Sequence, residues 1–265
     1  MSPMNNRLLV PRKTPGLLDL VPGAAAAYSL RSLSNSYAGP VVTVRRSSDD
    51  SEEGFTAAEV ADGTLAAFCG AGNGFVKQWW DQSGNANHCT SSADGVEPKV
   101  VDSGVLIAPG GVSAIRFDGV DDRMTFSTSS YSQPVTIISV VTGAIGGSQY
   151  YYDGIDVGGR HAILSDSSAN RYVFCNTGVT VAIQTATGIH VDFAVFDGSA
   201  SYVSTNGVSA LASLGSTSFS GLKVSARYTN TNFSSLDWHT LIVYPSDQTA
   251  NRELLEGQIA WSHSQ

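Results

Sequence analysis

Short apolar segments recur about every ten residues through the second half of this chain. They are residues 135–141, 150–152, 161–164, 171–175, 179–184, 190–196, 200–205, 221–227 and 238–244. Asp197-Gly198 and Asn206-Gly207, two dipeptides that favour tight hairpin turns, follow two of these segments. Many short strands at this spacing are typical of a β-sandwich, so the sequence predicts an all-β fold.

One of these segments, 135–141 (VTIISVV), is apolar at nearly every position rather than at alternate positions. A strand with one exposed face alternates apolar and polar side chains, whereas a strand buried on both faces does not. We therefore expect 135–141 to be a central strand that is covered on both faces.

The first half of the chain mixes predicted helices with strands. Thr56 and Glu59 have the spacing of a capping box, which predicts a helix from Thr56 to about Phe68. The alanine-rich segment Ala24–Leu33 predicts a second helix, and residues 246–261 predict a third near the end. The predicted strands of this half are 37–46, 75–80, 98–107 and 113–117.

The composition argues against several classes of partner. Fifteen Lys and Arg against 23 Asp and Glu give a formal net charge of −8, which disfavours nucleic acid or an anionic membrane as the main partner. The most apolar early run, Leu17–Leu33, is broken by Pro22 and Gly23 and is too short and too polar to cross a bilayer. We expect a protein that works among neutral ligands or other proteins, with no membrane insertion.

The cysteines indicate a reducing compartment. Cys69, Cys89 and Cys175 are odd in number and widely spaced, so they do not suggest a disulfide framework. The N-terminal segment also lacks the continuous apolar core of a signal peptide.

Residues 1–22 contain four prolines, which predicts an extended arm rather than a helix. The arm is basic in an acidic protein, and we expect it to dock on a neighbouring subunit, with residues 23–265 as a single β-sandwich domain. The alternative is that it packs on the surface of its own chain. The expected docking residues are Arg7, Leu8, Leu9, Val10, Pro11 and Arg12.

Residues 75–90 (FVKQWWDQSGNANHCT) gather aromatic, amide and acidic side chains in one stretch. Because Trp and Tyr rings stack on sugars, this stretch is a candidate glycan site, together with the tyrosines at 150–152. The alternative is a buried strand followed by a turn whose polar side chains bond their own backbone. The candidate glycan-binding residues are Trp79, Trp80, Asp81, Asn85, Asn87, His88, Tyr150, Tyr151 and Tyr152.

Asp118, Asp121 and Asp122 form an acidic turn between two apolar runs. Oxygen-rich loops bind calcium, so this turn is the candidate cation site, although a plain hairpin turn explains the same residues. The five histidines show no zinc-binding spacing, and we expect no other cofactor.

The segment 190–208 (HVDFAVFDGSASYVSTNGV) resembles the paired strands of concanavalin A-like (laminin-G-type) jelly rolls. In that family an apolar strand, a D-G turn, a second strand and N-G follow one another. Phe117–Asp122 and the ending Leu241–Tyr244 before a C-terminal helix fit the same pattern. The resemblance covers roughly residues 98–265 and implies a jelly-roll β-sandwich.

A second resemblance covers residues 24–101. Val44–Asp49, Ala67–Cys69 and above all Trp80–His88 (WDQSGNANH) are similar to the start of the catalytic module of α-L-arabinofuranosidase B. The resemblance implies a retaining glycosidase. Such an enzyme needs a nucleophile and an acid/base carboxylate about 5–5.5 Å apart.

The catalytic positions of that family hold other residues here. The nucleophile stands in a strand of the form G-x-x-E-A-I, and the nearest match, Gly158–Ile163, has His161 in its place. The region of the acid, Leu222–Tyr228, has no carboxylate, and the position that pairs with Cys69 in the family's disulfide is Gly74. The resemblance therefore implies a non-catalytic relative, not an enzyme.

Concanavalin-like domains that begin with a short arm such as residues 6–12 (NRLLVPR) also resemble structural proteins of tailed-phage virions. We expect a virion surface protein, either a capsid decoration or head fibre or a tail or baseplate adhesin, assembled in the host cytoplasm. Its partners would be other virion proteins, copies of itself and host glycans. The alternative is a glycoside hydrolase of arabinofuranosidase type with relocated carboxylates, among which Asp153, Asp156 and Asp166 are candidates.

Overall fold

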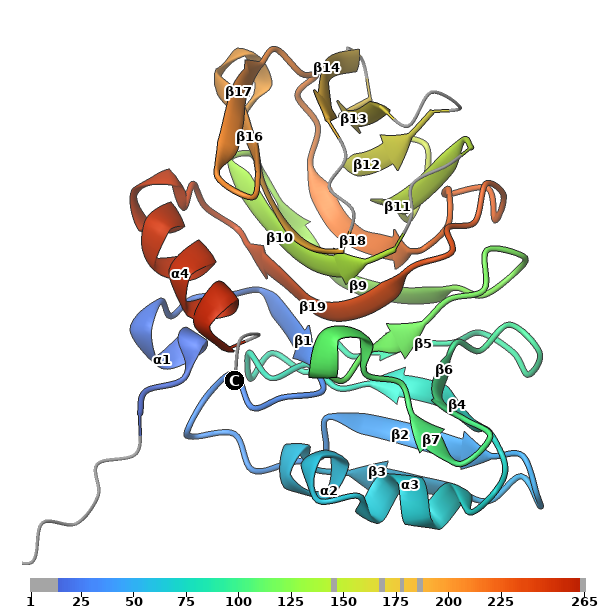
Figure 1. The fold of residues 1–265 in the computed structure, drawn as a ribbon. Helices are drawn as coiled ribbons and strands as arrows, with labels where there is room; N and C mark the ends of the chain where they lie inside the picture. The colour runs from blue at the N-terminus through green and yellow to red at the C-terminus, as the bar shows by residue number, and fades with distance from the viewer. Residues whose placement is uncertain (1–13, 144–146, 167–169, 177–178, 185–187, 263–265) are drawn as a thin grey trace, which may run out of the picture.

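Two curved sheets that face one another form the upper part of the molecule, and a smaller N-terminal layer lies below them (Figure 1). The computed structural model describes residues 14–143, 147–166, 170–176, 179–184 and 188–262. The first sheet contains, in order across it, β1 (Ala26–Ser29), β19 (Asp237–Tyr244), β10 (Val135–Thr142), β15 (Ile189–Phe196), β16 (Ser201–Thr205) and β17 (Val208–Ala212).

The second sheet lies opposite the first. It contains, in order, β5 (Cys89–Thr90), β9 (Met124–Tyr131), β18 (Phe219–Val224), β11 (Gln149–Gly154), β12 (Ala162–Ser165), β13 (Asn170–Phe174) and β14 (Val179–Gln184). Paired antiparallel sheets with short connections are the architecture that the strand spacing predicts, so the expected all-β sandwich is confirmed.

The N-terminal layer is a third set of strands that continues into both sheets. It contains β3 (Glu52–Phe55), β2 (Val42–Arg46), β4 (Gly74–Trp79), β6 (Lys99–Asp102) and β7 (Val105–Leu106). The short strand β8 (Ile115–Arg116) pairs with both β6 and β19 and so joins this layer to the first sheet. The remaining elements are α1 (Leu17–Leu20), α2 (Ala57–Ala61), α3 (Thr64–Cys69), η1 (Pro109–Gly111), η2 (Gly198–Ala200), η3 (Thr249–Asn251) and α4 (Arg252–Ser262).

The first sheet is covered on both faces, which explains the apolar run 135–141. Ile137 and Val141 of β10 point into the core between the sheets, whereas Ile138 and Val140 point outward. The outward side chains pack with Leu255 of α4 and with α1, which lies beside α4 in Figure 1. The expectation of a central strand buried on both faces is therefore confirmed.

The predicted helix at Ala24–Leu33 is wrong, because this segment forms β1. All four residues of β1 are buried, and their backbone groups pair with Thr240–Val243 of β19. Alanine favours a helix only when tertiary contacts do not decide the outcome. The hydrogen bonds to β19 and the burial of all four side chains decide it here.

The N-terminal segment departs from the extended arm that the prolines predict. Leu17–Leu20 form the short helix α1, and Leu17, Leu18 and Val21 are buried in the outer core against the first sheet. The prediction of an extended arm is therefore wrong from Leu17 onward. The expected docking residues, Arg7 to Arg12, lie outside the described residues.

The capping box at Thr56 is confirmed. The Thr56 backbone N–H donates to Glu59 Oε2 at 2.8 Å, and the Glu59 N–H donates back to Thr56 Oγ1 at 3.4 Å. The predicted single helix is nevertheless two helices, because Gly63 has a φ of +90° and separates α2 from α3. Among the described residues no helix is long and apolar enough to cross a membrane.

Cys69, Cys89 and Cys175 are free and buried. A Cβ atom added at Gly74 would lie 2.7 Å from Cys69 Sγ. Position 74 is therefore next to Cys69 in space, as the family resemblance implies, and the missing side chain of Gly74 makes room for the sulfur.

The Asp81 carboxylate ties the turn after β4 to the first sheet. Asp81 Oδ1 accepts hydrogen bonds from the backbone N–H groups of Ala27 and Ser83, both at 2.8 Å, and Oδ2 accepts one from Asn87 N–H at 3.0 Å. The side chain is buried, and Ala27 lies in β1. One carboxylate thus satisfies donors from segments more than 50 residues apart.

Replacing Asp81 by Ala should destabilise the protein by at least about 3 kcal/mol, because a buried donor left unpaired costs roughly 1–3 kcal/mol. Urea unfolding monitored by tryptophan fluorescence measures this loss. Asp94→Ala is the matched control, since Asp94 is exposed and its partner Lys77 keeps a second carboxylate, Glu97. The control should cost less than about 1 kcal/mol. Equal losses in the two variants would contradict the role of Asp81.

Candidate functional site

Most of the predicted glycan-binding residues serve the fold. Trp79 is fully buried and its ring lies 5.5 Å from that of Tyr28, and Tyr151 and Tyr152 are also fully buried. The Asn85 and Asn87 side-chain amides donate to backbone carbonyls of Ala24 and Ala25. Asp81 and the three buried aromatic side chains have no surface left for a sugar in this conformation, whereas Asn85 and Asn87 keep exposed surface.

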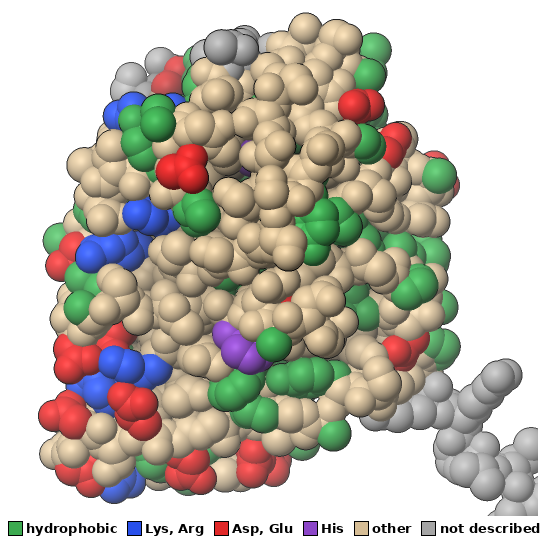
Figure 2. Space-filling view, turned by 180° about the vertical axis from the view of Figure 1, so that it is seen from behind, with side chains coloured by type: hydrophobic (Ala, Val, Ile, Leu, Met, Phe, Trp, Pro, Cys, Tyr) green, Lys and Arg blue, Asp and Glu red, His purple; other side chains and the backbone are tan. Residues whose placement is uncertain are grey.

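Trp80, His88 and Tyr150 keep exposed surface. The Trp80 and His88 rings lie 4.4 Å apart, and Trp80 Nε1 donates to Thr43 Oγ1 at 2.9 Å. Figure 2 shows a histidine beside a group of hydrophobic side chains on this face. Tyr150 contacts a different set of residues, around Arg160. Trp80 and His88 thus lie on one piece of exposed surface, and Tyr150 lies on another.

His161, at the position of the family's nucleophile, lies in the core between the sheets. Its ring packs against Phe196 and Phe219 at centroid distances of 4.8 and 5.5 Å, and Nδ1 contacts the Gly159 carbonyl. Burial lowers the pKa of His161 to about 4, so the imidazole is neutral. This position faces away from solvent and carries no chemistry here.

The other carboxylates considered as relocated catalytic groups have structural partners. Asp153 is fully buried and accepts two hydrogen bonds to Oδ2 and Oδ1 from the Arg160 guanidinium, at 2.8 and 3.0 Å. Asp156 accepts from the backbone N–H groups of Gly158 and Gly159, and Asp166 accepts from the Tyr172 hydroxyl. Two further pairs are Asp192 with Arg171 and Asp237 with Arg116.

A groove on the outside of the molecule has a different character. It has a volume of about 280 Å³ and lies between the N-terminal layer and the turn that follows β8; we call it the acidic groove. Its lining residues are Arg45, Phe75, Gly95, Glu97, Lys99, Asp102, Arg116, Asp118, Asp121 and Asp122.

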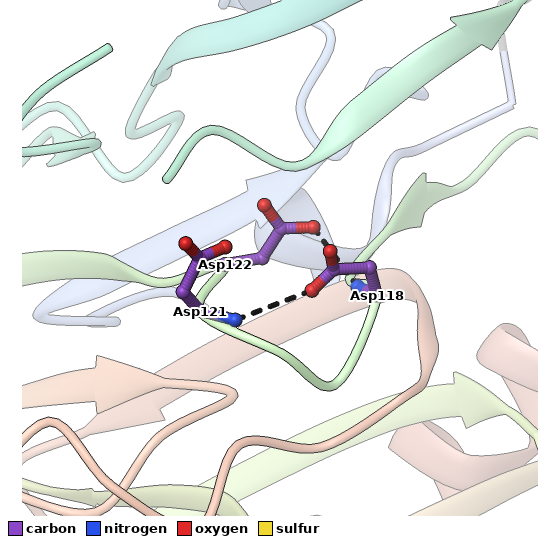
Figure 3. A group of neighbouring side chains, drawn as sticks. All are labelled: Asp118, Asp121 and Asp122. Carbon is purple, nitrogen blue, oxygen red and sulfur yellow. Dashed lines mark hydrogen bonds between the residues drawn. The ribbon is translucent and has the colours of Figure 1, made fainter. Parts of the chain in front are cut away.

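Three carboxylates meet on one side of the acidic groove (Figure 3). One oxygen from each of Asp118, Asp121 and Asp122 lies within 4.8 Å of the other two. Asp118 Oδ1 accepts hydrogen bonds from the Val120 and Asp121 N–H groups, and Asp122 Oδ2 accepts one from Asp118 N–H at 2.9 Å. The turn needs glycine at Gly119, whose φ is +78°. Backbone hydrogen bonds thus hold the Asp118 and Asp122 carboxyl groups in place.

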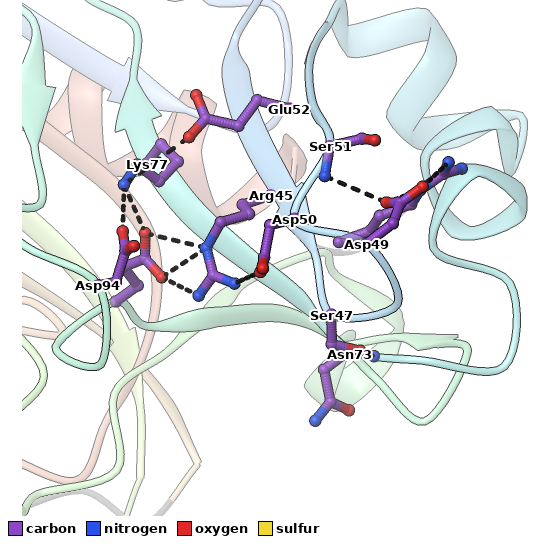
Figure 4. A network of polar contacts seen from close by, with 11 residues as sticks. Arg45, Ser47, Asp49, Asp50, Ser51, Glu52, Asn73, Lys77 and Asp94 are labelled. Carbon is purple, nitrogen blue, oxygen red and sulfur yellow. Dashed lines mark hydrogen bonds and ion pairs between the residues drawn. The ribbon is translucent and has the colours of Figure 1, made fainter.

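The cations of the groove are already paired. Arg45 and Lys77 both contact Glu97, whose side chain is fully buried, and Figure 4 shows the network around them. Lys99 pairs with Asp102 at 3.2 Å, and Arg116 pairs with Asp237 at 2.8 Å. Within the described part of the chain, no ion pair involves Asp118, Asp121 or Asp122. Among the described residues the three carboxylates therefore have no direct ion-pair partner, and the charge of Lys99 offsets their mutual repulsion only in part.

The pKa of Asp122 is raised to about 7, mainly by burial and less by the charges of Asp118 and Asp121, whereas the hydrogen bond from Asp118 N–H and the charge of Lys99 act to lower it. Asp122 is only 7% exposed, whereas Asp118 is exposed. Near neutral pH Asp122 therefore carries a proton for a large part of the time. A protonated carboxyl beside an exposed carboxylate is the pair of groups that acid-assisted bond cleavage requires.

The same three oxygens are the ones that the sequence suggested as calcium ligands. Each of the three residues offers one carboxylate oxygen, and oxygen ligands suit Ca²⁺. A bound cation would need Asp122 ionised, whereas acid catalysis needs it protonated. The two roles exclude one another and can be separated by experiment.

Comparison with known proteins adds the relatives of this fold. Residues 19–111 match the family model described as alpha-L-arabinofuranosidase B, catalytic. No curated protein sequence matches the chain. Six of the groove-lining residues, Arg45, Phe75, Gly95, Glu97, Lys99 and Asp102, lie inside the matched segment.

Solved structures of arabinofuranosidases have the same fold. An arabinofuranosidase complexed with arabinofuranosyl-α-1,2-xylobiose superposes with a TM-score of 0.62, and a GH54 α-L-arabinofuranosidase soaked with a cyclic sulfate inhibitor with 0.63. A mutant of a GH54 α-L-arabinofuranosidase soaked with 4-nitrophenyl α-L-arabinofuranoside gives 0.64. In each comparison the identity is 16%, and the match covers 89% of this chain but 62% of the other. The chain thus spans less than two thirds of these relatives.

These matches correct the prediction that the chain is not an enzyme. The matched family model is a catalytic one, and the matched structures are of glycosidases. The sequence predicts a loss of catalysis from the loss of two carboxylates, and it indicates either a calcium site or a plain hairpin turn at residues 118–122. None of these matches bears on a virion, so that location, the virion partners and docking by the arm stay predictions.

The pKa of Asp122 has a consequence for stability. Its folded-state value of about 7 lies above the ordinary value of 3.8, so between these values the native state holds a proton that the unfolded state has lost. Stability should therefore fall as the pH rises through this window. Asp122→Asn, which keeps the acceptor for Asp118 N–H, should remove about 1–2 kcal/mol of this fall.

Urea unfolding at pH 5 and pH 8 measures this difference. The Asp122→Asn variant should be more stable than the parent protein at pH 8 and about as stable as the parent at pH 5. Glu253→Gln, which neutralises an exposed carboxylate on α4, is the control and should shift both values alike. A parent protein and an Asp122→Asn variant with the same pH dependence would show that Asp122 titrates normally.

Proposed function

We propose that this chain is a glycoside hydrolase domain whose reacting carboxyl groups lie in the acidic groove. The observation that carries the proposal is the placement of the buried Asp122 carboxyl, whose pKa is raised to about 7, beside the exposed Asp118 carboxylate in an open groove. The resemblance to arabinofuranosidase catalytic modules supports the class of reaction. It does not supply these residues, because the family's own positions hold other side chains here.

In this proposal Asp122 is the general acid. It transfers its proton to the glycosidic oxygen as the bond from that oxygen to the anomeric carbon breaks. Asp118 attacks the anomeric carbon and forms a covalent glycosyl ester. Carboxylate oxygens within 4.8 Å of one another fit the short separation of retaining enzymes, about 5–5.5 Å, better than the longer one of inverting enzymes.

The second half of the reaction uses the same groups. Asp122, now ionised, removes a proton from water, and the resulting hydroxide displaces Asp118 from the anomeric carbon. Both transition states carry positive charge on the sugar ring. Asp121, which has no cationic partner among the described residues, supplies negative charge beside it.

The substrate class follows from the relatives and from the groove. One of the similar arabinofuranosidases is complexed with arabinofuranosyl-α-1,2-xylobiose and another is soaked with 4-nitrophenyl α-L-arabinofuranoside, so an α-L-arabinofuranoside is the first substrate to test. Phe75 lines the groove and keeps part of its ring exposed, which provides an apolar surface for a sugar ring.

The two roles can be separated by the leaving group. With 4-nitrophenyl α-L-arabinofuranoside the leaving phenolate needs little protonation, whereas an arabinosylated xylo-oligosaccharide leaves through an alcohol and needs the acid. Asp118→Asn should lower kcat by at least about 100-fold on both substrates. Asp122→Asn should lower it by about 100-fold or more on the oligosaccharide and far less on the nitrophenyl glycoside.

Asp156→Asn is the control, since Asp156 is an exposed carboxylate that caps a turn away from the groove. It should leave both rates within about twofold of the parent. A parent protein that releases no sugar from either substrate would refute the proposal. A large loss in Asp156→Asn with none in Asp118→Asn would place the chemistry elsewhere.

Calcium distinguishes catalysis from cation binding at the same turn. If Asp122 acts as an acid, EDTA should leave hydrolysis of the oligosaccharide unchanged, and millimolar Ca²⁺ should slow it by holding Asp122 ionised. Activation by Ca²⁺ that EDTA reverses would contradict the acid role and support the cation site.

A further inference from the structure

A cluster of arginine and tyrosine side chains lies on the outer face of the second sheet and has no role in the fold or in the acidic groove as described so far. Its members come from β11, from the segment before β12, from β18 and from the loop after β18. They are Tyr150, Asp153, Arg160, Lys223, Arg227 and Tyr228, and we call them the arginine–tyrosine cluster.

Asp153 and Arg160 form the rigid base of this cluster. Arg160 is 8% exposed and Asp153 is fully buried, and their side chains form a two-pronged ion pair. Asp153 Oδ2 also accepts a hydrogen bond from Tyr228 N–H at 3.2 Å. Arg160 Nη2 donates to the Tyr150 hydroxyl at 3.2 Å. The positions of both tyrosines are thus fixed by one buried pair.

The second guanidinium, Arg227, contacts two aromatic rings. Its Cζ lies 5.9 Å from the Tyr150 ring centroid and 5.3 Å from the Tyr228 ring centroid. The Arg160 Cζ lies 5.6 Å from the Tyr150 centroid and 4.9 Å from the Tyr228 centroid, so both guanidinium groups contact the same two rings. Arg227 Nε is buried and has no hydrogen-bond partner. Among the described residues Arg227 is in no ion pair. The segments that the structure does not describe contain no Asp or Glu that could pair with it.

The local charge is positive in an acidic protein. Lys223 donates to the Tyr228 carbonyl and to Asn230, not to a carboxylate. The cluster therefore has three cations, Arg160, Arg227 and Lys223, against the single carboxylate of Asp153. Two guanidinium groups that contact the same rings repel one another unless a second anion lies between them. The chain supplies one anion, so the site is short of one.

The cluster lies on the same sheet as one edge of the acidic groove. β18 and β9 are neighbours, with Val224 opposite Met124, and Arg123 follows Asp122 directly. The pKa of Lys223 is lowered, mainly by burial and secondly by the positive charge of Arg123. A glycan several sugars long that enters the groove can therefore run towards the cluster along this sheet.

We propose that the arginine–tyrosine cluster binds the carboxylate of an acidic sugar, a uronic acid unit of the glycan that enters the acidic groove. Arg227 pairs with the carboxylate through its free N–H groups, and the Tyr150 and Tyr228 rings contact the sugar. The identity of the polymer rests on the proposed function; the charge that the cluster recognises does not. The net charge of −8 led us to expect neutral ligands, and this cluster is a local exception.

The test compares two xylo-oligosaccharides that differ in one group. One carries a glucuronic acid unit, and in the other the carboxyl of that unit is reduced to a neutral alcohol. Binding is measured by calorimetry on the full chain carrying Asp118→Asn, so that turnover does not interfere. The acidic oligosaccharide should bind at least tenfold more tightly, and Arg227→Gln should abolish the difference.

Arg252→Gln is the matched control, because Arg252 on α4 carries the same charge but pairs with Glu256. It should keep the tenfold preference, and thermal unfolding should show that both variants fold. Equal binding of the two oligosaccharides, or a preference that survives Arg227→Gln, would overturn the inference. So would an equal loss in Arg252→Gln, which would mean general ionic attraction only.

The outcome is independent of hydrolysis. If the parent chain cleaves no glycoside but the carboxylate preference persists and depends on Arg227, the proposed function fails and the acidic-sugar site stands. If the chain cleaves arabinofuranosides but shows no preference, the reverse holds.

Discussion

The buried Asp81 carboxylate is the interaction on which the rest of the structure depends. It accepts hydrogen bonds from β1 and from both sides of its own turn, and β1 in turn pairs with β19 in the middle of the first sheet. Gln82 adds bonds to the segment after β1, through the Ser29 and Arg31 carbonyls. The N-terminal layer and the sandwich are therefore held in one arrangement by a few polar side chains. The WDQSGN stretch, which lies within the segment that matches the family model, thus contributes to the fold through Asp81 and Gln82.

The chemistry does not follow the same stretch. Where the relatives' pattern has a glutamate, His161 packs between two phenylalanines, and Asp153 is neutralised by Arg160. Three carboxylates without an ion-pair partner among the described residues lie instead in the acidic groove, where burial and like charges raise the pKa of Asp122 to about 7. A protein that retains a sandwich can thus place acid chemistry on a turn at its edge, because the scaffold requires only that the turn reverse the chain.

The sequence predicts those features that depend on local pattern. The strand at 135–141, the capping box of Thr56 and Glu59 and the turn after β4 all follow from short-range spacing. It does not predict features that depend on distant partners. Ala24–Leu33 is a strand because β19 lies beside it, and Trp79 rather than Trp80 is buried because of the layer around β4. The pKa of Asp122 depends on how deeply the turn is buried, which no spacing in the sequence reveals.

The most direct test of the account is to identify the carboxylate that attacks the sugar. A cyclic sulfate of arabinofuranose configuration is an electrophile that reacts with a nucleophilic carboxylate and remains attached. After reaction with the full chain, digestion and peptide mass spectrometry locate the label. The account predicts a single modification on Asp118, prevented by prior addition of substrate. A label on Asp153 or Asp156, or no label on a folded and active protein, would contradict it.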